Sequence, residues 1–237
     1  MWCCAHAGWC AMTDTLVVVT NPRNIPDAMT AFRALSCDLA FVTGYTQAEA
    51  VEPMRALMAE QASRYDLFMV CADDCVVTQA AVDAVVRLLE DGHPAATGWC
   101  RLDRTHACVN LTTKPLRGNV PTVDGYTWWR YDEVMAWADE VVPTHFMGMG
   151  LTAMPVELWQ RFPYDVFTDD GRGYSSDFHL SMRLRDAGVP MVAARSGFID
   201  HLKERWLMAD AAPHMRLLLG EVPQSVTIET ARARGRA

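Results

Sequence analysis

The sequence predicts an α/β fold in which helices flank a mostly parallel central sheet. Short β-branched runs alternate with amphipathic helical segments between residues 15 and 100, which is typical of a parallel sheet covered on both faces. About half of the 237 residues (51%) are apolar, so we expect one sizeable hydrophobic core. The chain has no internal repeat or low-complexity linker, and we therefore expect a single domain.

The first half of the chain predicts strands and helices in strict alternation. The predicted strands are short apolar runs at residues 15–20, 38–43, 66–71 and 95–100. The predicted helices have apolar side chains at helical spacing and span residues 27–36, 47–64 and 79–90. Thr78 is a candidate N-cap for the last of these helices. Sheets of this type bind ligands beyond the carboxyl ends of their strands.

The second half of the chain is less regular. Residues 101–142 contain a predicted strand at 109–113 and an aromatic group that we expect to serve recognition, consisting of Tyr126, Trp128, Trp129, Tyr131 and Trp137. A glycine-containing strand is expected at 145–153. Helices are expected at 155–162 and 178–187, and a last strand at 191–194 leads to His201.

The two ends of the chain are expected to lie outside the domain. We expect residues 1–14 to be a disordered N-terminal extension, residues 15–205 to form the domain, and residues 206–237 to form a C-terminal segment. That segment ends in a basic tail, Arg232, Arg234 and Arg236, which we expect to be mobile because short termini are ordered only when they are tied down.

Charge and hydropathy exclude some classes of protein. The net charge of -8 argues against a broad phosphate-binding face, although it leaves nucleic acid open as a molecule on which the protein acts. The apolar runs are too short to span a bilayer, so no membrane association is expected. The first residues do not resemble a secretory signal, which makes a cytoplasmic location the default expectation. The eight cysteines are scattered and are expected to be mostly buried thiols.

Two adjacent carboxylates follow the third predicted strand. Asp73 and Asp74 come directly after the apolar run that ends at Cys71, and apolar residues resume after them. Ionised groups in such a place need a counter-charge, and a hard divalent cation bound with substrate phosphates supplies one. The alternative is that both residues cap the following turn.

Two later residues have the same ambiguity. Asp177 opens a predicted helix after the polar stretch 168–173, where it is either a functional acid or a first-turn acid favoured by the helix dipole. His201 emerges from the last strand beside Lys203 and Arg205, and is either a ligand or a structural histidine.

Taken together, these residues resemble the motifs of GT-A glycosyltransferases, particularly family 2 and its relatives, over about residues 15–205. The matching segments are Thr20-Asn-Pro-Arg23, Cys71-Ala-Asp-Asp74, Ser176-Asp177 with Arg183 and Gly188, and His201. The chain departs from the family at Cys71, which stands where the common Asp-Ala-Asp-Asp motif has its first acid.

The resemblance implies a GT-A-like, Rossmann-type domain and a metal-dependent glycosyltransferase of the hexosyltransferase type. The donor would be a nucleoside-diphosphate sugar such as a UDP-sugar, bound by Thr20, Asn21, Arg23, Asp73, Lys203 and Arg205. Mn²⁺ or Mg²⁺ would be held by Asp73, Asp74 and His201, with the direct bond placed on Asp73 and Asp74 beside it. Asp177 would be the catalytic base of a direct displacement with inversion.

Recognition of the sugar and acceptor is predicted less specifically. Gly148 and Gly150 would let the backbone approach the sugar, or they serve close strand packing. Trp128 and Trp129 would stack on a sugar ring or a nucleobase, or they belong to a minor core. The acceptor hydroxyl belongs to a protein, a modified DNA base or a soluble glycan, and a lipid acceptor is disfavoured.

Two other functions compete with this interpretation. A nucleotidyltransferase shares such an α/β core and its strand-end carboxylates, but it normally has a glycine-rich loop after the first strand, and residues 20–26 contain no glycine. A noncatalytic nucleotide-sugar binding module is suggested by Cys71 in place of an acid.

Overall fold

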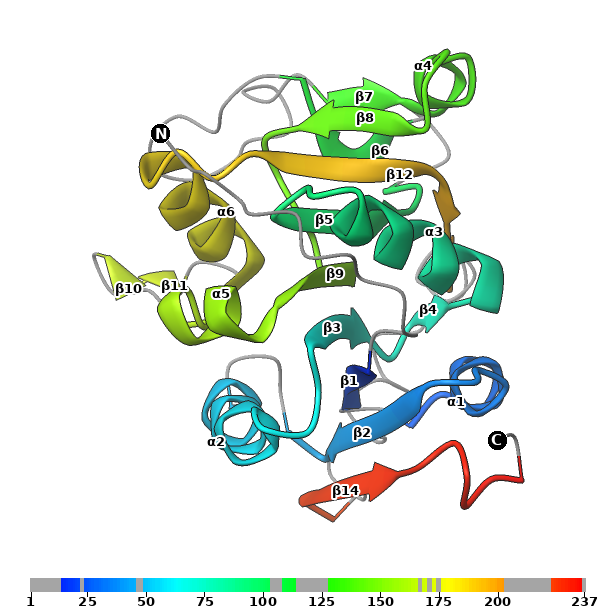
Figure 1. Ribbon diagram of the computed structural model, residues 1–237, viewed down its shortest axis with the longest axis vertical. Helices are drawn as coiled ribbons and strands as arrows, with labels where there is room; N and C mark the ends of the chain where they lie inside the picture. Colours follow the sequence, from blue (N-terminus) through cyan, green and yellow to red (C-terminus); the bar gives the residue numbers. More distant parts are fainter. Residues whose placement is uncertain are drawn as a thin grey trace.

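The fold was obtained as a computed structural model of the 237-residue chain. It describes residues 14–21, 24–45, 49–102, 108–113, 128–165, 168–169, 172–173, 176–202 and 223–235. These residues form an α/β fold with a mixed central sheet flanked by helices, which confirms the predicted fold class (Figure 1). Within them, no helix combines the length and hydropathy needed to cross a bilayer.

The central sheet has eight strands within the described residues. Their spatial order is β14 (Ser225–Glu229), β2 (Asp38–Thr43), β1 (Thr15–Asn21), β3 (Leu67–Ala72), β9 (Gly150–Pro155), β5 (Ala95–Trp99), β12 (Met191–Phe198) and β8 (Val141–Thr144). The pairs β1–β2, β1–β3 and β5–β12 are parallel, whereas β9, β8 and β14 pair antiparallel with their neighbours. The expected parallel arrangement therefore holds for the strands of the first half, and later strands make the sheet mixed.

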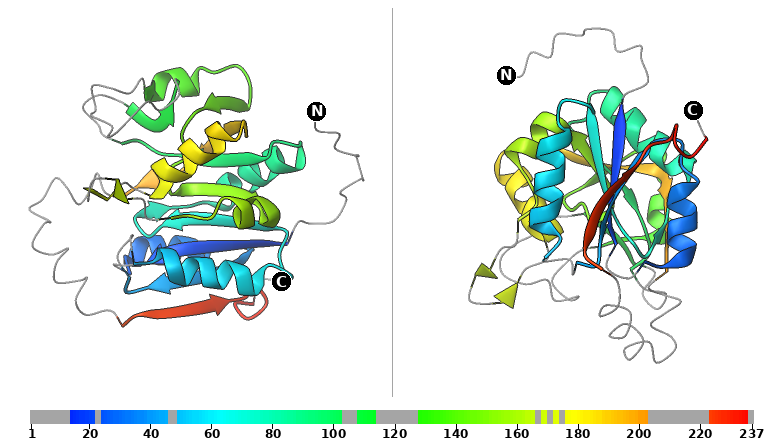
Figure 2. Two further views of the ribbon diagram at one scale, coloured as in Figure 1. Left: turned by 90° about the vertical axis from the view of Figure 1, so that its left-hand side faces the viewer. Right: turned by 90° about the horizontal axis from the view of Figure 1, so that it is seen from below.

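Helices cover both faces of this sheet. Alternate strand residues point to opposite sides, and apolar residues on both sides are buried against helices. Val17 and Val19 of β1 belong to one core cluster with α1 (Pro26–Arg33) and α3 (Gln79–Glu90). Leu16 and Val18 belong to the other cluster, with helices α2 (Val51–Gln61), α5 (Val156–Arg161) and α6 (Ser176–Asp186). Figure 2 shows the sheet enclosed between these two helical layers.

A third, smaller core lies at the β8 end of the sheet. It forms beneath β6 (Cys108–Thr112), β7 (Trp128–Arg130) and α4 (Tyr131–Met135), around the fully buried Trp99. Trp129, Tyr131 and Trp137 pack against this cluster, and the Nε1 atom of Trp129 donates to the carbonyl of Pro143 at 3.1 Å. These three aromatic residues thus pack against a minor core, in line with the alternative given above for part of the aromatic group, and a role of the group in recognition stays a prediction.

The expected strand at 145–153 begins later than predicted. β9 starts at Gly150, and residues 145–149 form a loop that continues from β8. The Thr144 hydroxyl accepts from the Phe146 backbone N–H at 3.2 Å, and the Ser181 hydroxyl accepts from the Met147 N–H at 3.0 Å. Side chains thus take up the backbone N–H groups of Phe146 and Met147, so these two groups do not bond to a neighbouring strand.

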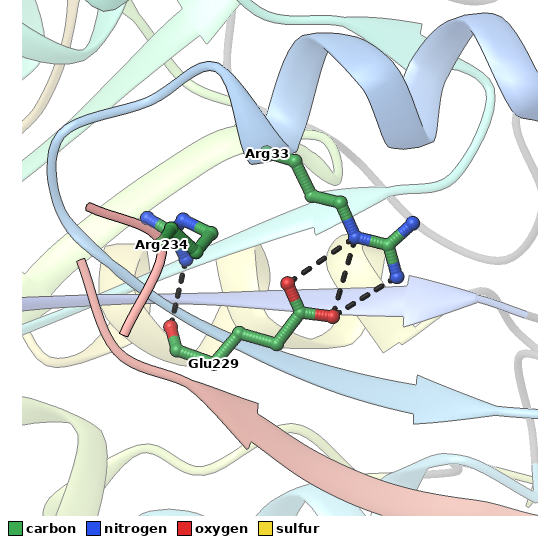
Figure 3. Close-up of polar contacts among 3 residues, drawn as sticks. All are labelled: Arg33, Glu229 and Arg234. Carbon is green, nitrogen blue, oxygen red and sulfur yellow. Dashed lines mark hydrogen bonds and ion pairs between the residues drawn. The ribbon is translucent and has the colours of Figure 1, made fainter. Parts of the chain in front are cut away.

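The C-terminal segment is tied to the sheet, which corrects the expectation of a mobile tail. β14 pairs with β2, and the Glu229 carboxylate accepts from the Arg33 guanidinium at 2.9 Å (Figure 3). Arg234 donates to the backbone carbonyls of Glu229 at 2.7 Å and Leu35 at 3.0 Å, and also to that of Cys37. A domain boundary at residue 205 would leave out a strand of the central sheet. Residues 1–13 of the expected extension at 1–14, and Arg236, lie outside the described residues.

Candidate functional site

One edge of the sheet gathers the chemically important residues. β1, β2 and β3 are parallel, and β5 has the same direction because β9 runs antiparallel to both β3 and β5. β12 is parallel to β5, so the carboxyl ends of all five strands meet at one edge, together with the start of β9. This is the edge at which open α/β sheets bind ligands.

The acidic pair is held at this edge by the end of β1. Asp73 and Asp74 lie between β3 and the two-residue strand β4 (Cys75–Val76), and both are buried. The Asp73 backbone N–H donates to the carbonyl of Thr20 at 3.0 Å, and the Thr20 hydroxyl donates to the carbonyl of Cys71 at 3.4 Å. Thr20 therefore fixes the backbone on both sides of Ala72.

His201 is brought to Asp74 by a short strand pairing. β13 (Asp200–His201) pairs antiparallel with β4, and the Leu202 N–H donates to the carbonyl of Asp74 at 2.7 Å. The Nε2 atom of His201 lies 3.4 Å from Oδ2 of Asp74, and its Nδ1 atom lies 3.3 Å from the carbonyl oxygen of Arg101.

This geometry sets a ring nitrogen of His201 against a carboxylate oxygen of Asp74. A carbonyl oxygen only accepts hydrogen bonds, so Nδ1 of His201 has to carry the proton that bonds to Arg101. In a neutral ring the Nε2 lone pair then faces a carboxylate oxygen of Asp74, and two acceptors at 3.4 Å require a proton or a metal ion between them. Metal-binding histidines commonly donate their other N–H to a backbone carbonyl in this way.

Two side chains at this edge could hold part of a metal site. Asp74 and His201 supply one oxygen and one nitrogen, and within the described residues no three His, Cys, Asp or Glu side chains form a complete metal-binding group. Mg²⁺ and related ions bind in active sites through one or two protein ligands together with substrate phosphates. It is Asp74 that faces His201, whereas the sequence placed the direct bond on Asp73.

Asp177 lies at the start of α6, in a place that disfavours its charge. Burial raises the pKa of its carboxyl to about 6, and backbone N–H groups, including those of Phe178 and Met149, partly oppose this shift. The Oδ1 atom accepts from the Phe178 N–H at 2.9 Å. Asp177 is therefore a first-turn acid of the helix, and its pKa is also close to neutral pH, which suits a general base.

The backbone of Met149 joins the two acidic regions. Its carbonyl accepts from the Ala72 N–H at 2.8 Å, directly before Asp73, and its N–H donates to the Asp177 carboxylate. The Ser181 hydroxyl, one turn further along α6, donates to the carbonyl of Asp177 at 2.8 Å. The loop at residues 145–149 thus spans the space between the strand-end acids and Asp177.

The structure brings three of the four predicted sugar-contacting residues to this loop. Gly148 and Gly150 flank Met149, and Trp128 packs edge-on against Phe146, with ring centroids 5.8 Å apart. Phe146 in turn contacts Phe178, next to Asp177, at 4.5 Å. Trp129, the residue after Trp128, packs against the minor core described above. The Asn21 side chain and the residues Arg23, Lys203 and Arg205 lie outside the described parts of the chain.

Asn110 lies beside this loop and was not singled out by the sequence analysis. It lies on β6, is only 4% exposed, and accepts from the Cys100 N–H through Oδ1 at 2.7 Å. The available signal was a single amide between apolar neighbours, Val109 and Leu111, within a predicted strand. Buried polar side chains of this kind need a partner, and they are therefore candidates for structural or ligand contacts.

Comparison with known proteins gives a likeness of fold. No protein-family model and no curated protein sequence matches the chain. The crystal structure of A197 from STIV is similar to it, with a TM-score of 0.52 and 11% identity, covering 77% of this chain and 82% of that one. At this identity the likeness concerns the fold alone.

Two other solved structures have lower similarity. A crystal structure of GalNAc-T7 with UDP, GalNAc and Mn²⁺ has a TM-score of 0.49 and 12% identity over 83% of this chain, which spans 45% of that protein. The inositol-1-phosphate CTP transferase from T. maritima has a TM-score of 0.47 and 8% identity over 89% of this chain and 98% of that chain.

Proposed function

We propose that this protein is a metal-dependent glycosyltransferase that moves a sugar from a nucleoside-diphosphate sugar to an acceptor hydroxyl with inversion. The observation that supports this most is that Asp74 and His201 face each other at the carboxyl edge of the sheet. Met149, in the loop at residues 145–149, connects this edge to Asp177 through hydrogen bonds. A divalent cation at that pair would neutralise the charge that develops on the departing diphosphate.

The chain's own residues have separate tasks in this reaction. Asp74 and His201 would hold the Mn²⁺ or Mg²⁺ ion, and the carbonyl of Arg101 keeps the imidazole in the tautomer that such binding requires. Thr20 holds the backbone of the acidic motif in position. The cationic side chains at Arg23, Lys203 and Arg205 stay predicted donor contacts.

Asp177 would serve as the general base. The acceptor oxygen forms a bond to the anomeric carbon, the bond from that carbon to the diphosphate oxygen breaks, and the acceptor proton passes to the Asp177 carboxylate. Its carboxyl is suited to this step because burial raises the pKa to about 6, so the group is ionised at neutral pH and still takes up a proton readily.

The test is binding of nucleoside diphosphates, measured by calorimetry with UDP, GDP, CDP and ADP in Mn²⁺, in Mg²⁺ and in excess EDTA. One of these nucleotides should bind tightly only with the divalent ion, and the corresponding nucleotide sugar should be hydrolysed slowly without an acceptor. Equal binding in EDTA would refute the metal site. Tight metal-dependent binding without any hydrolysis would favour a binding module, and release of pyrophosphate from a nucleoside triphosphate and a sugar phosphate would favour a nucleotidyltransferase.

A further inference from the structure

The side chain of Asn110 lies between the two halves of the candidate site. Its Oδ1 atom accepts from the Cys100 N–H, and the next residue, Arg101, holds His201 through its carbonyl. Its Nδ2 atom lies against the backbone of Gly148 and Gly150, which flank the Met149 peptide that bonds to Asp177. Asn110 thus contacts backbone groups next to Arg101, which bonds to His201, and next to Met149, which bonds to Asp177.

The lack of a side chain at Gly148 and Gly150 leaves room for this amide. Neither Gly148 nor Gly150 has a positive φ, so backbone conformation does not explain why either position lacks a side chain. A Cβ atom at either position would lie 3.1 Å from Nδ2 of Asn110, which is closer than ordinary van der Waals contact. The amide therefore occupies the space that a side chain on either glycine would fill.

The orientation of the amide is decided by its hydrogen bonds. Because a backbone N–H only donates, the atom that faces Cys100 is the oxygen, and the NH₂ group points toward the glycines. Other donors already bond to the glycine carbonyls: the Gly148 oxygen accepts from the Thr152 hydroxyl at 2.6 Å, and the Gly150 oxygen accepts from the Thr97 hydroxyl at 3.4 Å. Nδ2 has no hydrogen-bond partner among the residues that the structure describes.

We propose that Asn110 is a specificity residue whose amide N–H donates to an oxygen of the transferred sugar, either a ring hydroxyl or an acetamido carbonyl. This inference rests on the proposed glycosyltransferase function and adds a residue that selects the sugar. An amide that is oriented as a donor discriminates between sugars, because a sugar without the matching oxygen does not form this hydrogen bond and therefore binds more weakly.

The test compares the dissociation constant of a nucleotide with that of its sugar conjugate, by calorimetry in Mn²⁺ on the full chain. The probes are UDP against UDP-glucose and UDP-N-acetylgalactosamine, and GDP against GDP-mannose. Asn110→Ala should reduce the affinity gained from the sugar by roughly three- to tenfold, as expected for one neutral hydrogen bond, while leaving the nucleotide affinity unchanged. Asn110→Asp keeps an acceptor for the Cys100 N–H but removes the donor, so it should show the same loss of the affinity gained from the sugar. This variant tests the proposal if the alanine variant does not fold.

Thr112→Val is the matched control. Thr112 is buried on the same strand, two positions from Asn110, and its hydroxyl has no partner among the described residues. An unchanged gain from the sugar in Asn110→Asp, or an equal loss in Thr112→Val, overturns the specificity role while leaving the glycosyltransferase proposal intact. If the wild-type chain binds none of the nucleotides with Mn²⁺, the glycosyltransferase proposal itself fails and this inference fails with it.

Discussion

His201 faces Asp74 with one ring nitrogen and a backbone carbonyl with the other. The Nε2 atom lies 3.4 Å from the Asp74 carboxylate, and Nδ1 lies 3.3 Å from the carbonyl oxygen of Arg101. Strand pairing between β13 and β4 imposes this contact, since His201 is in register with Cys75, the residue after Asp74. The pair is therefore built into the sheet edge rather than formed by two flexible side chains.

Removing either member of this pair should weaken metal-dependent nucleotide binding. We expect His201→Ala to reduce affinity in Mn²⁺ by at least about tenfold, in the range seen when a group supporting a metal is lost. Asp74→Asn should reduce it further, because it removes the negative charge that attracts the cation. Titration calorimetry with and without EDTA measures both effects.

The controls are His93→Ala and Asp91→Asn, which remove the same side-chain types at the turn between α3 and β5, the opposite edge of the sheet. Both should bind like the wild type. If His201→Ala retains full Mn²⁺-dependent affinity, the imidazole is not a ligand and its contact with Asp74 is an ordinary ion pair.

Replacing the proposed base should separate catalysis from stability. Asp177→Asn keeps an oxygen that accepts from the Phe178 and Met149 N–H groups, so the helix start should be preserved. Loss of a general base typically costs about 10² to 10⁴ in rate, and we expect transfer to fall by at least about a hundredfold with unchanged donor affinity. Thermal melting and steady-state kinetics measure the two properties, and near-normal turnover with earlier melting would show that Asp177 only caps the helix.

The raised pKa of Asp177 predicts two dependences on pH. Its carboxyl has a pKa of about 6 in the folded protein, above its ordinary value of 3.8, because burial disfavours the charge. The rate should therefore rise with pH up to about 6 and then level off, because the base has to be ionised. The folded state binds the proton more tightly than the unfolded chain, so this group stabilises the fold fully below pH 4 and loses that contribution as pH rises through 6.

The difference in melting temperature between the wild type and Asp177→Asn isolates the second effect. With rising pH between 4 and 6 the wild type should lose stability relative to the variant, and the difference should stay constant above neutral pH. A difference that is independent of pH over this range would contradict the burial of the carboxyl.

The C-terminal segment should be stabilised more by Arg234 than by Arg33. Arg234 is partly buried and donates to the backbone carbonyls of Leu35, Cys37 and Glu229, and hydrogen bonds from charged groups contribute about 1.5–3 kcal/mol. The Arg33–Glu229 ion pair is solvent-exposed, with the Arg33 side chain 55% exposed, and such pairs contribute about 0–1 kcal/mol. Urea unfolding of Arg234→Ala and Arg33→Ala should show this order, and equal losses would contradict it.

The sequence by itself determined the first half of the molecule. Apolar periodicity placed β1, β2, β3 and β5 and the helices between them, because parallel strands buried on both faces need continuous apolar runs. It also placed Asp73 and Asp74 at a strand end and Asp177 in the first turn of a helix, since the polar residues follow directly where those patterns change. These features depend on residues that are near one another in the chain.

Only the tertiary structure decided which distant residues meet. The register of β13 on β4 selects Asp74 as the partner of His201, and the antiparallel entry of β9 between β3 and β5 places Met149 between Ala72 and Asp177. The docking of β14 on β2 depends in the same way on contacts between the two ends of the chain. The local propensity of a segment for helix or strand does not predict such pairings. Their free energy comes from hydrogen bonds and packing between segments that meet only when the sheet forms.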